Sequence, residues 1–207
     1  MARPANTEVD NARMRVRLAD GALTLFRQHG LEAVTLRRLA MQMGVSHTML
    51  YRYFESKEAL FTAVRLASLH ALQQQLDAAD DTAQDSLSRI RAVSEALIRF
   101  GIEHAREYRF LFSAEQPALA ENAELLALRH GVFDHIVAIA EAAAAQGVIT
   151  MEPRTWVHMA WALLHGLLTL NESNQLLEGR SFSELVDAAL AVLLSESDRP
   201  GRQSIPG

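Results

Sequence analysis

The sequence predicts an all-α fold, and three of its features support this. Apolar residues recur at intervals of three and four through long stretches, the spacing that gives a helix one apolar face. The few Pro and Gly residues fall mostly between these stretches, where helices are expected to end. No stretch shows the alternation of strands and helices that indicates a parallel sheet. We therefore expect an N-terminal three-helix domain over residues 1–56, a second helical domain over 57–197 and a disordered tail over 198–207.

The N-terminal domain is expected to hold helices at residues 12–29, 35–43 and 47–53. Gly30 ends the first helix, and Thr35 can cap the second because its hydroxyl can accept a hydrogen bond from a free backbone N–H. Gly44 follows the second helix at a position that favours a positive φ, and Ser46 can cap the third. A helix, a tight turn and a second helix in this order predict a helix-turn-helix unit, which presents its second helix to the DNA major groove.

The predicted third helix divides into an inward set and an outward set. Leu50 and Phe54 lie four residues apart, so they share a face and are expected to pack into the core. The other side chains are left to other faces, and they are His47, Thr48, Met49, Tyr51, Arg52 and Tyr53. This second set is basic, aromatic and polar, as a DNA-reading surface requires.

Charge is distributed unevenly along the chain. Residues 1–57 hold nine Lys and Arg against five Asp and Glu, a net charge of +4, whereas the whole chain is −5, so residues 58–207 carry −9. A basic N-terminal segment followed by an acidic remainder is what we expect of a protein that binds phosphates at one end only. The alternative is a solvated surface with uneven charge.

Six further helices are expected at residues 57–78, 83–105, 108–112, 118–145, 153–172 and 181–194. Pro153 suits the first turn of its helix, and Ser181 with Glu184 forms a capping-box pattern at the start of the last. Turns are expected at residues 80–82 and 113–117. Together these elements predict a second domain that is helical throughout.

The last two predicted helices carry apolar residues on more than one face, namely Ala160, Leu163, Leu164, Leu167, Leu168, Leu170, Leu185, Val186, Ala189, Leu190, Val192 and Leu193. A helix that is apolar on several sides must be buried on several sides, and a chain of 207 residues offers limited body to cover it. We therefore expect a homodimer through these two helices, with two-fold symmetry. The alternative is that both helices are internal to one chain.

Residues 15–60 resemble the N-terminal domain of TetR-type transcriptional repressors. The resemblance rests on Phe26, Gly30, Thr35 before a basic pair, Gly44-Val45-Ser46, the run Leu50-Tyr51-Arg52-Tyr53-Phe54 and the run Ser56-Lys57-Glu58-Ala59-Leu60. Several spaced features agree, which is more specific than one short motif. The resemblance implies a repressor that binds double-stranded DNA at a near-palindromic operator, with a helix-turn-helix domain followed by a helical ligand-binding and dimerisation domain.

The resemblance also assigns DNA contacts to particular positions. Arg37 is expected to contact a base edge, whereas Thr35 and Arg38 would lie nearer the phosphates. Lys57 begins the fourth helix, where its charge and the helix dipole both favour a phosphate. The full predicted set is Thr35, Arg37, Arg38, Ser46, His47, Thr48, Met49, Tyr51, Arg52, Tyr53 and Lys57.

The family further implies an apolar cavity among the C-terminal helices, whose occupant weakens DNA binding. The side chains expected to line it are Phe100, His104, Phe110, Phe133, Trp161 and His165, with Phe112 and Trp156 as further candidates. Such a lining favours a small hydrophobic effector. For the aromatic residues the alternative is an ordinary core position, and for the two histidines a hydrogen-bonded structural role. Residues 105–117 and 156–170 also resemble a TetR-like subgroup named for a Trp-His-Gly pattern, here Trp161, His165 and Gly166.

Other functional classes find little support in the sequence. The absence of cysteine excludes disulfides, thiolate metal sites and cysteine nucleophiles. No apolar run reaches the roughly 18–20 residues of a membrane span, and the N-terminus lacks a signal-peptide core, so we expect a cytoplasmic protein. His158 and His165 share a helix face, but no hydrolase or metal motif supports an enzyme, a cofactor or a metal site. A DNA-binding protein that has no ligand, or is controlled by a protein partner, remains as the alternative.

Overall fold

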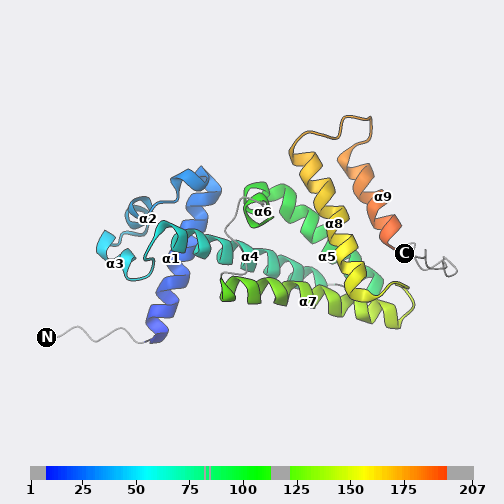
Figure 1. Cartoon of the computed structure of the whole chain (residues 1–207), viewed down its shortest axis with the longest axis horizontal. Helices are drawn as coiled ribbons and strands as arrows, with labels where there is room; N and C mark the ends of the chain where they lie inside the picture. Colours follow the sequence, from blue (N-terminus) through cyan, green and yellow to red (C-terminus); the bar gives the residue numbers. More distant parts are fainter. Residues whose placement is uncertain (1–7, 82, 84, 113–121, 195–207) are drawn as a thin grey trace, which may run out of the picture. The chain divides into compact units, whose positions relative to one another are not determined.

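The computed structural model describes residues 8–81, 83, 85–112 and 122–194. Within these ranges the chain forms nine α-helices, one short 3-10 turn and no strand, which confirms the predicted all-α fold (Figure 1). The elements in order are α1 (Glu8–His29), η1 (Leu31–Ala33), α2 (Leu36–Met43), α3 (His47–Tyr51), α4 (Lys57–Asp81), α5 (Ser86–Glu103), α6 (Ala105–Phe112), α7 (Ala123–Ala145), α8 (Pro153–Glu172) and α9 (Phe182–Leu194). The expected turn at 113–117 and the expected disordered tail at 198–207 lie outside the described residues.

The described residues fall into two compact units. The N-terminal unit lies within Met1–Ala71 and Arg106–Leu128, and the C-terminal unit within Leu72–Ala105 and Arg129–Gly207. Helix α4 therefore contributes to both units, whereas the expected division at residue 57 gives all of it to the second.

The core of the N-terminal unit joins α1, α2, α3 and the start of α4. Its most deeply buried side chains include Leu18, Leu39, Leu50, Phe54 and Leu60. Leu50 and Phe54 are both fully buried, which confirms the inward set predicted for the third helix. Because Leu60 packs in the same cluster, the fourth helix supports a domain that would be small for a stable core by itself.

Local capping explains where the helices of this unit begin and end. The Thr35 hydroxyl accepts a hydrogen bond from the backbone N–H of Arg38 at 3.2 Å, and the Ser46 hydroxyl accepts one from that of Met49 at 3.1 Å. Gly44 ends α2 with a φ of 63°, in the left-handed region that side chains other than glycine rarely adopt. All three predicted roles are confirmed.

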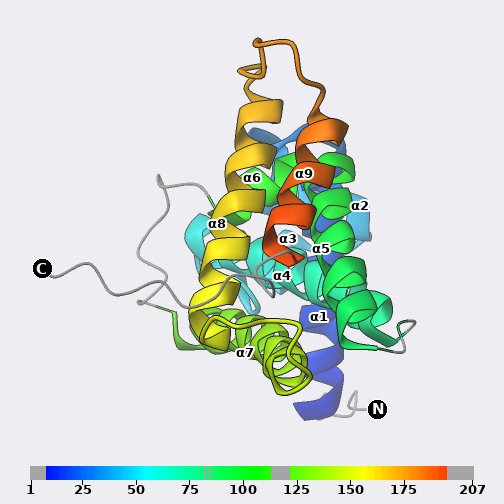
Figure 2. The ribbon, with the colours of Figure 1, turned by 90° about the vertical axis from the view of Figure 1, so that its right-hand side faces the viewer.

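The C-terminal unit contains α5, α8, α9, the second part of α4 and α7 from Arg129 onward. Helices α8 and α9 lie side by side in both views (Figures 1 and 2). The indole N–H of the buried Trp156 donates a hydrogen bond to the carbonyl oxygen of Leu193 at 3.1 Å, which links the start of α8 to the end of α9. The predicted capping box is confirmed, because the Ser181 backbone N–H donates to Glu184 Oε2 at 2.8 Å and the Glu184 N–H donates to Ser181 Oγ at 3.3 Å.

The end of α4 corrects one prediction. The turn expected at residues 80–82 is wrong for Asp80 and Asp81, which remain helical. The physical reason is an ion pair, since Arg89 Nε and Nη2 donate to the two carboxylate oxygens of Asp80 at 2.6 and 2.8 Å. Sequence patterns of acidic residues indicate turns on average, but a buried charge with a partner on the next helix overrides them.

Candidate nucleic-acid interface

Helix α3 presents a polar, exposed surface opposite its buried residues. Ser46, His47 and Thr48 at its start are exposed, and Met49 is half-buried. The ring of His47 meets that of Tyr51 edge to face, with centroids 4.9 Å apart. This contact orders the two rings against each other while both remain accessible, which suits contacts to a flat base edge or a sugar.

Helix α2 adds two exposed guanidinium groups, those of Arg37 and Arg38. Thr35, by contrast, is half-buried and its hydroxyl oxygen caps α2. Arg52, just after α3, is also exposed. The helix-turn-helix unit therefore brings three arginines to its surface, each able to neutralise a phosphate or to bind guanine with two hydrogen bonds.

Tyr53 and Lys57 lie where the chain passes from α3 to α4. The Tyr53 hydroxyl donates a hydrogen bond to the Oδ1 atom of Asn11 on α1 at 3.3 Å, so it is held in place and can still accept one. Lys57 is exposed, with its ammonium group 5.1 Å from the centre of the Phe61 ring. Because Lys57 opens a 25-residue helix, the positive end of the helix dipole adds to its attraction for a phosphate.

Two contacts between α1 and α2 fix the angle at which the unit presents α3. The Gln42 amide donates to the backbone carbonyl of Gly21 at 3.2 Å. A Cβ atom on Gly21 would lie 2.5 Å from the sulfur of Met43, so the absence of a side chain lets the helices approach closely. Gln42 and Asn11 were not among the predicted residues, because nothing in the local sequence indicates a partner 21 or 42 residues away.

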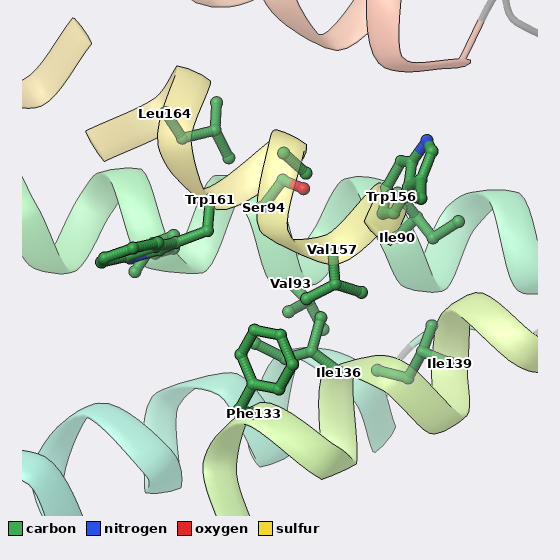
Figure 3. Close-up of a pocket in the computed structure, with 12 residues that line it drawn as sticks. Ile90, Val93, Ser94, Phe133, Ile136, Ile139, Trp156, Val157, Trp161 and Leu164 are labelled. Carbon is green, nitrogen blue, oxygen red and sulfur yellow. The ribbon is translucent and has the colours of Figure 1, made fainter. Parts of the chain in front are cut away.

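The C-terminal unit holds a second candidate site, an apolar cavity of about 60 Å³ between α5, α7 and α8. Its lining includes Ile90, Val93, Phe133, Trp156, Trp161 and Leu164. Figure 3 shows the two tryptophans on α8, Phe133 pointing towards α8 from α7, and Val93 on α5. The only polar side chain among the residues drawn around it is that of Ser94, so the cavity suits an apolar guest.

The predicted ligand-binding residues do not all meet there. Phe133, Trp161 and the further candidate Trp156 line the cavity. His165 stacks on Trp161 from outside it, with ring centroids 5.3 Å apart, and burial lowers the pKa of its imidazole. Phe100 is fully buried with its ring 5.1 Å from that of His104, and neither lines the cavity.

Phe110 lies in the N-terminal unit instead. Its ring centre is 5.0 Å from that of Phe26 on α1 and 6.4 Å from that of Phe61 on α4. The neighbouring Glu107 carboxylate, also on α6, accepts two hydrogen bonds from Arg27, at 2.6 and 3.1 Å. Helix α6 is thus packed and ion-paired against α1, the first helix of the N-terminal unit.

No helix in the described part of the chain is long and apolar enough to cross a membrane.

Family models match two regions of the chain. Residues 18–64 match the model described as "Bacterial regulatory proteins, tetR family". Residues 90–193, about half of the chain, match the model described as "Tetracyclin repressor-like, C-terminal domain". The first region covers the exposed surface of α2 and α3, and the second covers the cavity.

Individual proteins resemble part or most of the chain. The nucleoid occlusion factor SlmA of Vibrio vulnificus is 37% identical over 71 residues, which cover 34% of this chain and 36% of that protein. The chain thus spans about a third of the length of this curated relative. A Rhodococcus sp. RHA1 protein described as of unknown function has a similar structure, with a TM-score of 0.74, 25% identity, and coverage of 87% of this chain and 93% of that one. The regulator FadR of Bacillus subtilis, solved with stearoyl-CoA, has a TM-score of 0.67 and 15% identity over 89% of this chain and 98% of its own.

Proposed function

The chain belongs to the tetR family and is a DNA-binding transcriptional regulator, and from that premise we propose that it is a homodimeric, cytoplasmic repressor released from its operator by a small apolar ligand. The observation that carries the DNA-binding role is the exposed surface of α2 and α3, with Arg37, Arg38 and Arg52 beside the reading helix. Proteins of this family act through DNA rather than by catalysis. We also propose that the C-terminal half belongs to the Trp-His-Gly subgroup of the family.

The dimer proposal is supported by apolar side chains that remain uncovered on α8 and α9. Met159 is 56% exposed and Val192 is 61% exposed, and Leu163 and Leu170 on α8 are exposed as well. A monomeric protein rarely leaves such a set in water, so a second copy that covers it would stabilise both chains. Two copies would also place two reading helices on one DNA duplex, with half-sites about one helical turn apart.

The ligand proposal is supported by the apolar lining of the cavity around Phe133 and Trp161. Its volume of about 60 Å³ is well below the roughly 300–1,000 Å³ of sites that hold drug-sized ligands. A ligand would therefore have to displace lining side chains. We propose that this displacement is passed along the chain from α5 to the DNA-binding helices. Helix α5, which lines the cavity, continues after His104 into α6, and α6 pairs with Arg27 of α1 through Glu107.

The operator is best identified by selecting bound fragments from a random pool of double-stranded DNA. We expect enrichment of a near-palindrome with half-sites about one turn apart. The same selection with Arg37→Ala should give weaker enrichment and relaxed preference at one base position per half-site. A pool without any enriched sequence would contradict the proposed function.

Ligand binding can be followed directly because both tryptophans of the chain, Trp156 and Trp161, line the cavity. We expect an uncharged alkyl probe, 1-octanol, whose chain stands in for the acyl chain of the stearoyl-CoA held by FadR, to change tryptophan fluorescence and to weaken operator binding by about 5–150-fold. In Ala160→Phe, which fills the cavity, both responses should be lost while operator binding remains. Ligand binding without any effect on operator affinity would refute the repressor-release mechanism, because linkage requires the effects to be reciprocal.

The alternative is a DNA-binding protein controlled by a protein partner. The observation that favours it is the similarity to the nucleoid occlusion factor SlmA over 71 residues. It predicts that the Ala160→Phe variant behaves like the wild type in every DNA-binding assay.

A further inference from the structure

Arg65 on α4 is a buried cation that has no anionic partner among the described residues. Its residue surface is only 8% exposed, and its guanidinium carbon lies 4.9 Å from the centre of the Phe110 ring. Over the residues that the structure describes it forms no ion pair, and its Nε atom has no hydrogen-bond acceptor. Burial lowers the pKa of this guanidinium, because a charge removed from water is destabilised.

Ser68, three residues further along α4, is also buried with a polar atom that lacks a hydrogen-bond partner among the described residues. This atom is its hydroxyl oxygen, and the residue is fully buried. Residues three apart lie on the same side of a helix, so Arg65 and Ser68 belong to one face of α4. More than nine in ten buried polar groups in proteins are hydrogen-bonded, so two unpartnered groups on one face call for an explanation.

Two other arginines pair with a buried carboxylate. In the same unit, Arg27 pairs with the buried Glu107, and in the C-terminal unit Arg89 pairs with Asp80. A buried charge without a partner is strongly destabilising, whereas an apolar residue of similar size would not be. The presence of an arginine at position 65 therefore points to a partner that the described part of the chain does not supply.

We propose that Arg65 and Ser68 form a binding site for the carboxylate or phosphate group of an organic anion, whose apolar part lies against Phe110 and Phe61. A guanidinium donates hydrogen bonds to such oxyanions from several N–H groups, and a serine hydroxyl adds one more. Phe110 lies under the guanidinium, and Phe61 meets Phe110 edge to face at 6.4 Å. All four residues belong to the N-terminal unit, so the site is separate from the cavity around Trp161.

The site also adjoins the DNA-binding surface through one face of α4. Lys57 lies over the ring of Phe61, and Phe61 contacts Phe110 under Arg65. An anion at Arg65 would therefore touch the same aromatic pair that supports Lys57. The proposal implies a second effector site, which acts on the DNA-binding unit directly.

The test is a thermal unfolding titration of the full chain with inorganic phosphate and with sodium octanoate, each compared with sodium chloride at equal ionic strength. We expect a concentration-dependent rise in Tm with at least one of these anions. A rise with phosphate alone identifies a free phosphate group as sufficient, and a rise with octanoate alone identifies a carboxylate on an apolar chain. No rise with either anion would overturn the proposal.

Three variants make the test specific. In Arg65→Met the apparent affinity for the anion should fall by roughly tenfold to a hundredfold, since a hydrogen bond to a charged group is removed. Without anion this variant should be at least as stable as the wild type, because an unpaired buried charge has been removed; a clearly lower Tm would show a structural role and count against the site. Ser68→Ala should weaken anion binding while the fold is retained. Arg91→Met, at an exposed position on α5, is the matched control and should leave the response unchanged.

A fourth variant separates the two sites. Ala160→Phe fills the cavity of the C-terminal unit, so an anion response that persists in it supports the site at Arg65. A response that is abolished in Ala160→Phe and retained in Arg65→Met would assign the anion to the cavity and overturn the proposal.

Discussion

The ion pair between Arg27 and Glu107 should be a main attachment of α6 to α1 within the N-terminal unit. Arg27 Nε and Nη2 donate to the two carboxylate oxygens of Glu107 at 2.6 and 3.1 Å. The Glu107 side chain is 1% exposed and that of Arg27 is 40% exposed. Arg106 adds a hydrogen bond from Nη1 to the backbone carbonyl of Arg27 at 3.1 Å. Removal of this pair should therefore loosen α6 from the end of α1.

The magnitude follows from this geometry. Breaking a fully buried ion pair costs about 3–5 kcal/mol, because one charge is left uncompensated. Exposure of Arg27 to solvent reduces that figure, since water screens the pair and can hydrate the carboxylate once the arginine is gone. We expect Arg27→Met to lower the free energy of unfolding by about 2 kcal/mol, and the coupling energy with Glu107→Gln to be about 1–3 kcal/mol.

The assay is a double-mutant cycle measured by urea unfolding at one protein concentration. The control is a second cycle on Arg180 and Glu184, an ion pair on α9 and the loop before it whose side chains are 72% and 55% exposed and which should give no measurable coupling. A coupling energy between Arg27 and Glu107 that does not exceed the control would show that this pair does not stabilise the fold. Operator affinity measured on the same variants tells whether the attachment of α6 also matters for DNA binding.

Two further predictions concern the C-terminal unit. A Cβ atom on Gly101 would lie 2.7 Å from both methyl carbons of the buried Leu168, so Gly101→Ala should lower the free energy of unfolding by about 1–3 kcal/mol. Gly131→Ala, where no heavy atom lies within 4 Å, is the matched control and should instead raise it by about 0.5–1 kcal/mol; equal effects at the two glycines in urea unfolding would contradict this. The hydrogen bonds from Arg89 lower the pKa of Asp80, so this carboxylate contributes its full stabilisation above the pKa of an unfolded aspartate, about 3.9, and loses it as the pH falls through the lower folded value. Asp80→Asn should therefore cost about 1–3 kcal/mol at pH 7, and the difference from the wild type should shrink below about pH 4; a difference that grows towards low pH would show that the sign is wrong.

The helices of the N-terminal unit and their ends were largely predictable, because the sequence patterns that determine them are local. The caps at Thr35 and Ser46 and the left-handed turn at Gly44 depend on residues within four positions of each other. The spacing of Leu50 and Phe54 alone assigns them to one buried face. The contacts that set the angle of α3, such as that from Gln42 to Gly21, depend on how two helices dock, and this has no local signal.

The cavity was predicted less well for a related reason. Aromatic residues in a helical sequence indicate burial, but they do not indicate which helix faces which. Phe133 and Trp161 do line the cavity, whereas Phe110 packs in the other unit and Phe100 packs against His104. The unpartnered Arg65 could not be found from the sequence, because an arginine on a helix is ordinarily solvated and only its burial marks it.

Exposed basic residues among the first 57 positions are proposed to neutralise DNA phosphates. The most direct measurement is the salt dependence of operator affinity for the wild type, Lys57→Ala and the control Arg91→Ala, followed by fluorescence anisotropy on the selected operator. The logarithm of the affinity should fall linearly with that of the salt concentration, and Lys57→Ala should reduce this slope by about 1, because one DNA phosphate is no longer neutralised. Arg91→Ala should match the wild type. An unchanged affinity and an unchanged slope in Lys57→Ala would contradict the assigned surface.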